Sequence, residues 1–110
     1  MAPYDVQFLQ EAMEDLEEII LYIAKDSRRA ALQAHDKIIT KVRELSVFPR
    51  RGRPVPDKKM ADAGYRMLGI LPYIAFYRIV GEHIFIYRVI HGATNYPLLY
   101  EKMVQKTPPA

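Results

Sequence analysis

The side chains best suited to proton or phosphate chemistry are concentrated in the second half of the chain. His91 follows an apolar run and precedes Gly92, and imidazole is the side chain that most readily transfers protons near neutral pH. Arg66, Arg78 and Arg88 fall within three successive apolar runs. A charge in such a run needs a partner, because an unpaired buried charge is costly. Two interpretations follow: the arginines pair within the fold, or they form a site for a phosphate or an acidic peptide.

Other catalytic motifs are missing from the sequence. The chain has no cysteine, which excludes disulfides and cysteine-ligated zinc, and its five glycines form no phosphate-binding loop. His35, His83 and His91 lack the spacing of metal ligands, and Ser27 and Ser46 fit helix termini better than a nucleophile motif. We therefore expect no metal and no cofactor. His91 itself fits a structural role at a strand end as well as a catalytic one.

Length and composition indicate one globular domain over residues 1–110, with 105–110 as a frayed tail. Half of the 110 residues are apolar and 26% are charged, which argues against disorder. The absence of cysteine favours a reducing compartment, and neither a signal peptide nor an apolar stretch of about 20 residues is present. We expect a cytoplasmic protein with no membrane partner.

The charged residues are unevenly distributed along the chain. Residues 11–18 hold five acids and no base, whereas residues 25–59 hold eleven bases and four acids. The densest basic segment contains Arg50, Arg51 and Arg53. These charges either keep helix faces and a loop solvated, or form a basic surface for a polyanion or an acidic partner. In the second case, rising salt should weaken the binding of an acidic partner segment.

The first half of the chain predicts a strand and two helices. Residues 3–8 alternate apolar and polar side chains, as a half-buried strand does. Apolar residues at helical spacing predict a helix over 9–26 and a second over 28–47, which Phe48-Pro49 ends. The apolar stripe of the first helix comprises Leu9, Met13, Leu16, Ile20 and Ile23; that of the second comprises Ala31, Ala34, Ile38, Val42 and Leu45.

The second half predicts a sheet after an irregular loop over 49–64. Strands are expected at 65–71, 73–80 and 83–91, with Gly81-Glu82 as a type II′ hairpin turn. A two-residue turn makes Val80 pair with His83, so the two residue numbers of each facing pair along the hairpin add up to 163. Both sheet faces are largely apolar, so both need cover. We expect the helices on one face, and a partner segment or residues 94–105 on the other.

Alternation along this hairpin assigns each side chain to one face. The first face carries Ile74, Phe76, Arg78 and Val80 with His83, Phe85, Tyr87 and Val89. The second carries Tyr73, Ala75, Tyr77 and Ile79 with Ile84, Ile86, Arg88 and Ile90.

The order of these features resembles the RelE/ParE superfamily of bacterial toxins from type II toxin–antitoxin systems. The resemblance covers about residues 4–100 and rests on three segments: Ala12 to Ala24, Pro49 to Pro54, and Tyr77 to Gly92. It implies an α+β fold in which an N-terminal strand precedes an antiparallel two-helix hairpin packed on a small antiparallel sheet. It also implies a cognate antitoxin that wraps the toxin, and by analogy a homodimer or a toxin–antitoxin heterotetramer.

The superfamily divides by target, and the resemblance favours the ParE branch, which inhibits DNA gyrase and stabilises plasmids. The RelE branch cleaves mRNA on the ribosome with a Tyr-Arg-x-x-Tyr run, in which this chain has Ile74 in place of the arginine. The RelE pattern also expects a second basic residue shortly after the last strand, and this chain has Thr94 near that position. Arg66 and Tyr100, in contrast, match a basic and a tyrosine position of the nuclease pattern. Lost charges weaken transition-state stabilisation. The ParE pattern is also altered, because Thr94-Asn95 replaces its usual Arg-Asp.

The resemblance and the charge pattern together define the expected site residues. Target or antitoxin contacts are expected at Arg50, Arg51, Arg53, Arg66, Arg78, Arg88, His91, Asn95 and Tyr96. The alternative is a ribosome-dependent mRNA endonuclease that uses His91, Arg66, Arg88 and Tyr100. A third possibility is a non-toxic remnant that only binds its antitoxin.

Overall fold

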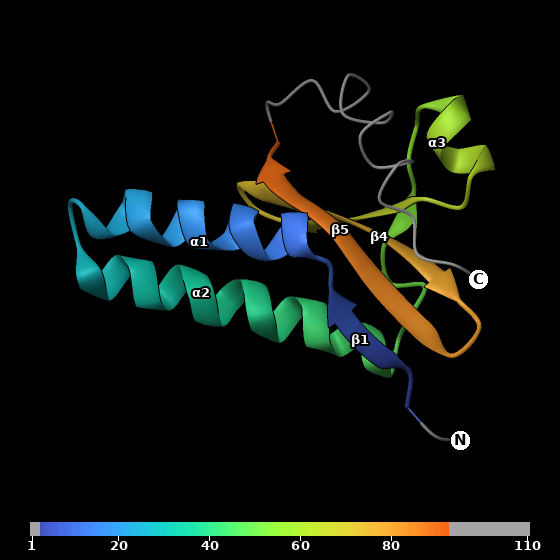
Figure 1. Ribbon diagram of the computed structural model, residues 1–110, viewed down its shortest axis with the longest axis horizontal. Coiled ribbons are helices and arrows are strands. Elements are labelled where there is room, and N and C mark those ends of the chain that lie inside the picture. Colours follow the sequence, from blue (N-terminus) through green and yellow to red (C-terminus); the bar gives the residue numbers. More distant parts are fainter. Residues whose placement is uncertain (1–2, 93–110) are drawn as a thin grey trace.

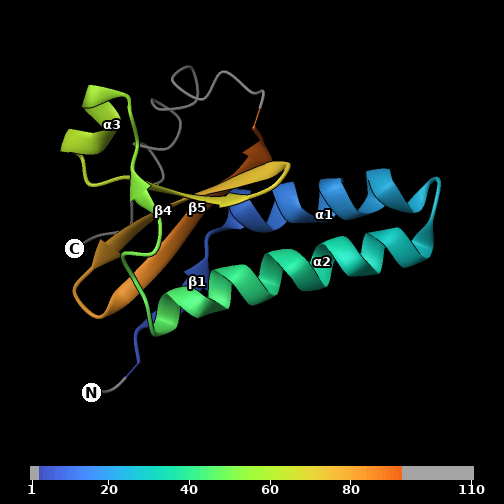
Figure 2. The same cartoon turned by 180° about the vertical axis from the view of Figure 1, so that it is seen from behind.

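A computed structural model describes residues 3–92 of the chain. Two long helices form an antiparallel hairpin beside a five-stranded sheet, and a short third helix lies apart from this hairpin (Figure 1). The same arrangement is seen from behind in Figure 2. In chain order the elements are β1 (Asp5–Phe8), α1 (Gln10–Ala24), α2 (Arg28–Arg43), the 3-10 turn η1 (Glu44–Ser46), β2 (Arg53–Pro54), α3 (Lys58–Asp62), β3 (Arg66–Ile70), β4 (Tyr73–Val80) and β5 (His83–His91).

The helical hairpin forms as the apolar periodicity predicts, with shorter helices. The Ser27 hydroxyl caps α2 by accepting the N–H of Ala30 at 3.0 Å. The predicted second helix over 28–47 is α-helical only to Arg43, and its last turn tightens into η1. None of the helices in residues 3–92 is long and apolar enough to cross a membrane.

The segment 49–64, predicted to be irregular, contains both β2 and α3. The Asp57 carboxylate accepts the N–H of Met60 at 3.0 Å and so caps α3. Met60 is fully buried and anchors this short helix. Neither element could be predicted from the sequence, because each is too short to show an apolar periodicity. The prolines and Gly52 in the segment are also typical of a loop.

The sheet has the strand order β1-β5-β4-β3-β2. Strands β2 to β5 pair antiparallel, whereas β1 pairs parallel with β5 and places Asp5 beside His83. The β4–β5 turn is of type II′, since Gly81 has a φ of +62° and Glu82 has no positive φ. The N-terminal strand thus lies next to the last described strand of the chain.

A β-bulge divides the β4–β5 hairpin into two registers. The predicted pairing holds from Val80 to Tyr77, and then slips by one residue so that Phe76 faces Arg88. The extra residue reverses the alternation predicted for the end of β5. Val89 therefore packs toward the helices and Ile90 toward the opposite face, the reverse of the predicted assignment.

Each face of the sheet contributes to its own apolar cluster. The helix-side cluster joins α1 and α2 to strand residues that include Tyr77, Ile84 and Ile86. On the other side, Val55, Met60 and Tyr65 pack against strand residues that include Phe76 and Tyr87. The chain therefore supplies some of the cover that was expected from a partner or from residues 94–105. The latter lie outside the described residues.

Candidate binding surfaces

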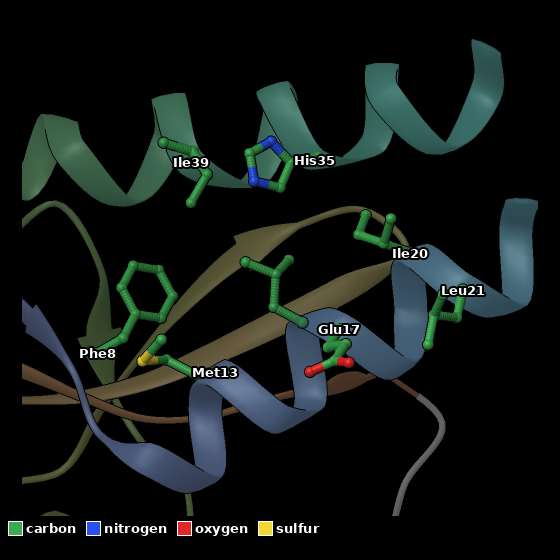
Figure 3. A pocket seen from close by; sticks show the side chains of 8 residues that line it. Phe8, Met13, Glu17, Ile20, Leu21, His35 and Ile39 are labelled. Carbon is green, nitrogen blue, oxygen red and sulfur yellow. The ribbon is translucent and has the colours of Figure 1, made fainter. Parts of the chain in front are cut away.

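An apolar groove runs between α1 and α2 on the surface of the hairpin (Figure 3). Its volume is about 600 Å³, and most of its lining is apolar. Met13 is 56% exposed and Leu21 is 59% exposed, although both are large apolar side chains. The eight lining residues are Phe8, Met13, Leu16, Glu17, Ile20, Leu21, His35 and Ile39. An exposed apolar groove of this size is typical of a surface that a partner covers.

Apolar residues on several sides of α1 create this groove. Ala12, Leu16 and Ile19 belong to the helix-side core, so the packed stripe differs from the predicted one. Met13 and Ile20, which were predicted to be core, instead line the groove. The whole groove was missed in the sequence, although an apolar arc on α1 wider than one buried stripe could have indicated it. Four of the five residues predicted for the second stripe are buried: Ala31, Ile38 and Val42 on α2, and Leu45 on η1.

Arg88 forms an ion pair inside the fold. Its Nε and Nη2 donate to Asp15 of α1 at 2.7 and 2.9 Å, and the backbone N–H of Val89 donates to the same carboxylate at 2.9 Å. The hydrogen bonds that Arg88 donates to the Asp15 carboxylate raise the pKa of its guanidinium above the ordinary value, against the opposing effect of burial. Arg88 therefore has the carboxylate partner expected from the interpretation in which the arginines pair within the fold.

Arg66 binds the loop that follows the helical hairpin. Its Nη2 donates to the carbonyl oxygens of Gly52 at 2.6 Å and Arg50 at 3.3 Å. The buried Tyr77 hydroxyl accepts the N–H of Gly52 at 3.0 Å and donates to the carbonyl of Pro49 at 2.9 Å. Together Arg66 and Tyr77 fix the backbone of residues 49–52 against the sheet.

Arg78 and His91 occupy two further positions on the sheet. Arg78 Nη1 donates to the Tyr87 hydroxyl at 3.3 Å, and its guanidinium lies 5.6 Å from the centre of the Tyr65 ring. Its buried Nε has no hydrogen-bond partner among the described residues. His91 is exposed at the end of β5, with its ring edge-on to that of Tyr73 at 6.0 Å.

The structure does not bring the residues of the nuclease alternative together. Arg66 pairs with Tyr77 and His91 pairs with Tyr73, so the two lie four residues apart along β4, about 13 Å. Arg88 is engaged with Asp15 on α1. Tyr100 lies outside the described residues, as do Asn95 and Tyr96, which were expected to contact a target or antitoxin.

Arg50, Arg51 and Arg53 are all exposed, and they lie together at the loop that Arg66 and Tyr77 fix. Arg51 pairs with Glu44 at 2.9 Å and lies over the ring of Phe48 at 4.8 Å. Within residues 3–92, no cluster of three His, Asp or Glu side chains could hold a metal ion. The described surface therefore offers an apolar groove and a basic loop.

Comparisons with known proteins agree with this architecture. Residues 6–96 match the family model described as ParE toxin of the type II toxin–antitoxin system parDE. The chain is 33% identical over 92 residues to Y4kP of Sinorhizobium fredii strain NGR234, a proposed toxin. The matched segment covers 84% of this chain and 92% of that protein.

Two solved structures also share the fold. One comes from the chromosomal ParDE toxin–antitoxin system of P. aeruginosa, with a TM-score of 0.66 and 26% identity over 80% of this chain and 95% of the other. The second is from the RelBE2 toxin–antitoxin complex of Mycobacterium tuberculosis, with a TM-score of 0.58 and 26% identity over 81% of this chain and 98% of the other. The chain therefore belongs to the ParE toxin family of type II toxin–antitoxin systems, within the RelE/ParE superfamily.

Proposed function

We propose that this toxin inhibits DNA gyrase in the cytoplasm, without catalysis of its own, and that a cognate antitoxin neutralises it. The proposal depends above all on the placement of the nuclease candidates. His91 and Arg66 lie about 13 Å apart along β4, and Arg88 is paired with Asp15. Phosphoryl chemistry requires its acid, base and charge-stabilising groups to converge on one phosphate. The family match to parDE toxins supports the gyrase target over the ribosome.

The antitoxin is proposed to bind in the α1–α2 groove. An amphipathic segment that fills the groove would bury the exposed side chains of Met13 and Leu21, and such apolar anchors supply most of the affinity of helix-in-groove complexes. Both solved neighbours come from toxin–antitoxin systems, which supports a partner of this kind.

A supercoiling assay with purified gyrase, relaxed plasmid and ATP tests the target. We expect the toxin to inhibit supercoiling and to accumulate cleaved plasmid, and stoichiometric antitoxin to reverse both effects. Full gyrase activity at excess toxin would contradict the proposal.

The mRNA endonuclease alternative retains one supporting observation. Arg50 and Arg66 both line a polar hollow of about 260 Å³, which could hold a phosphate. Cleavage of ribosome-bound mRNA that Arg66→Gln and His91→Ala each abolish, while both variants stay folded, would establish this alternative. Normal growth after induction of the toxin would instead indicate a remnant that only binds antitoxin.

A further inference from the structure

Four exposed basic residues form a continuous surface, which we call the basic band: Lys41, Arg50, Arg51 and Arg53. Three adjoining hollows connect them. Arg50 lines a hollow of about 260 Å³, Arg50 and Arg51 line the next of about 430 Å³, and Lys41, Arg51 and Arg53 line a third of about 300 Å³. Because neighbouring hollows share Arg50 or Arg51, the basic side chains follow one path along the surface.

The backbone beneath the basic band is fixed by contacts with the sheet. Tyr77 holds Pro49 and Gly52, and Arg66 holds the carbonyls of Arg50 and Gly52. A ligand therefore orders only side chains when it binds, which lowers the entropic cost of binding.

Within residues 3–92, most of the charge of the basic band is unneutralised. Residues 41–53 contain five bases and one acid, Glu44, which pairs with Arg51. Among residues 3–92 no carboxylate forms an ion pair with Lys41, Arg50 or Arg53. Three cations thus remain available to an anionic ligand.

We propose that the basic band binds the phosphate backbone of duplex DNA. Unpaired cations along a path suit a polyanion, and such contacts are independent of sequence. Unpaired bases bind by stacking on aromatic faces, but none of the four residues of the basic band is aromatic, and Arg51 covers one face of the neighbouring Phe48 ring at 4.8 Å. This favours duplex over single strands. The inference rests on the proposed function for its setting, since gyrase holds DNA, but the binding is measured without gyrase.

Val47 and Phe48 are 67% and 54% exposed beside the basic band, so an acidic protein segment with an apolar anchor is the competing ligand. The α1–α2 groove already offers such a segment a larger apolar surface. DNA therefore remains the ligand that the basic band itself favours.

Fluorescence anisotropy with a labelled duplex of about 30 base pairs, between about 50 and 200 mM salt, tests the proposal. We expect the full chain to bind with a steep salt dependence. The double variant R50Q/R53Q should bind about tenfold more weakly, equivalent to about 1.4 kcal/mol, and its salt slope should fall by about 2. The matched control R28Q/R29Q removes two exposed arginines at the start of α2, and should change the affinity less than about twofold.

Several outcomes would overturn the proposal. These are no binding by the full chain, equal losses in R50Q/R53Q and in the control, or tighter binding to single-stranded RNA than to the duplex. A loss of antitoxin affinity in R50Q/R53Q with unchanged DNA affinity would assign the basic band to a protein partner. Should R50Q/R53Q fail to fold, the single variant Lys41→Gln, at an exposed position of α2, provides the same test through its salt slope.

The supercoiling assay separates this inference from the proposed function. Gyrase inhibition by a toxin that does not bind duplex DNA would overturn the inference and keep the proposed function. DNA binding without gyrase inhibition would keep the inference and overturn the proposed function.

Discussion

Asp15 of α1 and Arg88 of β5, 73 positions apart in the sequence, form a two-point ion pair beyond the end of β1. The same carboxylate accepts the N–H of Val89 at 2.9 Å. Strand β1 pairs with β5 only as far as Ile86, and the bulge follows at once. Asp15 thus satisfies a strand N–H that has no neighbouring strand to bind.

Asp15→Asn should lower the free energy of unfolding by about 2–3 kcal/mol, because it leaves the half-buried Arg88 charge without its counter-ion. Urea denaturation followed by circular dichroism measures this change. Glu14→Gln, at an exposed position of the same helix, is the control and should cost less than about 0.5 kcal/mol. Equal losses in the two variants would show that the pair contributes nothing specific.

Gly52→Ala should destabilise the protein by about 2–3 kcal/mol. A Cβ atom at Gly52 would lie 2.6 Å from both the Met67 carbonyl oxygen and the Tyr77 hydroxyl, so the loop that carries the basic band would have to move. Gly69→Ala is the matched control, since a Cβ atom there meets nothing within 4 Å. Thermal melting should separate the two variants, and similar melting temperatures would contradict the close packing of Gly52.

Leu21→Glu should weaken antitoxin binding at least about tenfold without lowering the melting temperature. Leu21 is 59% exposed and lines the groove, so a carboxylate there affects the partner more than the fold. Leu71→Glu is the control, because Leu71 is 82% exposed and lies outside the groove lining. Isothermal titration calorimetry measures both affinities. Unchanged affinity in Leu21→Glu would remove the groove as the antitoxin site.

Acid should weaken the contact between β1 and the turn end of β5. Hydrogen bonds from Gln7 and then from His83 lower the pKa of Asp5 below its ordinary value of 3.8. A carboxyl whose pKa is lowered in the folded state stabilises the fold above its unfolded pKa, and this stabilisation is lost as the pH falls through the folded value.

The stability difference between wild type and Asp5→Asn should therefore shrink as the pH falls below about 4. Melting curves at several pH values measure it. Asp26→Asn, at another exposed acid, should show no such trend. A difference that stays constant down to about pH 2 would contradict the role of Asp5.

Most of the architecture could be predicted because it depends on local patterns. The α2 stripe, the three long strands and the Gly81 turn each follow from short-range spacing. The bulge could not be predicted, because one extra residue in β5 leaves no mark on the alternation of apolar side chains. Asp15, which accepts the Val89 N–H beside the bulge, is also far away in the sequence. Strand β1 was predicted, but its parallel pairing with β5 was not, since no local pattern specifies a distant partner.

The candidate site was less predictable than the fold. Arg50, Arg51 and Arg53 were predicted as the densest basic segment, because charge density is visible in the sequence, and the structure shows that all three are exposed. Their role in binding stays a prediction. Arg66 and Arg88 were expected either to pair within the fold or to bind a partner, and the structure gives both of them partners within the chain. Their contact with a target or antitoxin stays a prediction. The α1–α2 groove was missed because apolar periodicity does not show which residues the core leaves uncovered.

The parallel pairing of β1 with β5 also sets the order in which the sheet can be completed during synthesis. Asp5 leaves the ribosome early, but its partner His83 is translated 78 residues later. At 5–20 residues per second this delay is about 4 to 16 s. Until then β1 has no strand to pair with, and α1 lacks β5, the strand on which it packs. A nascent toxin therefore cannot complete its sheet before β5 has been translated.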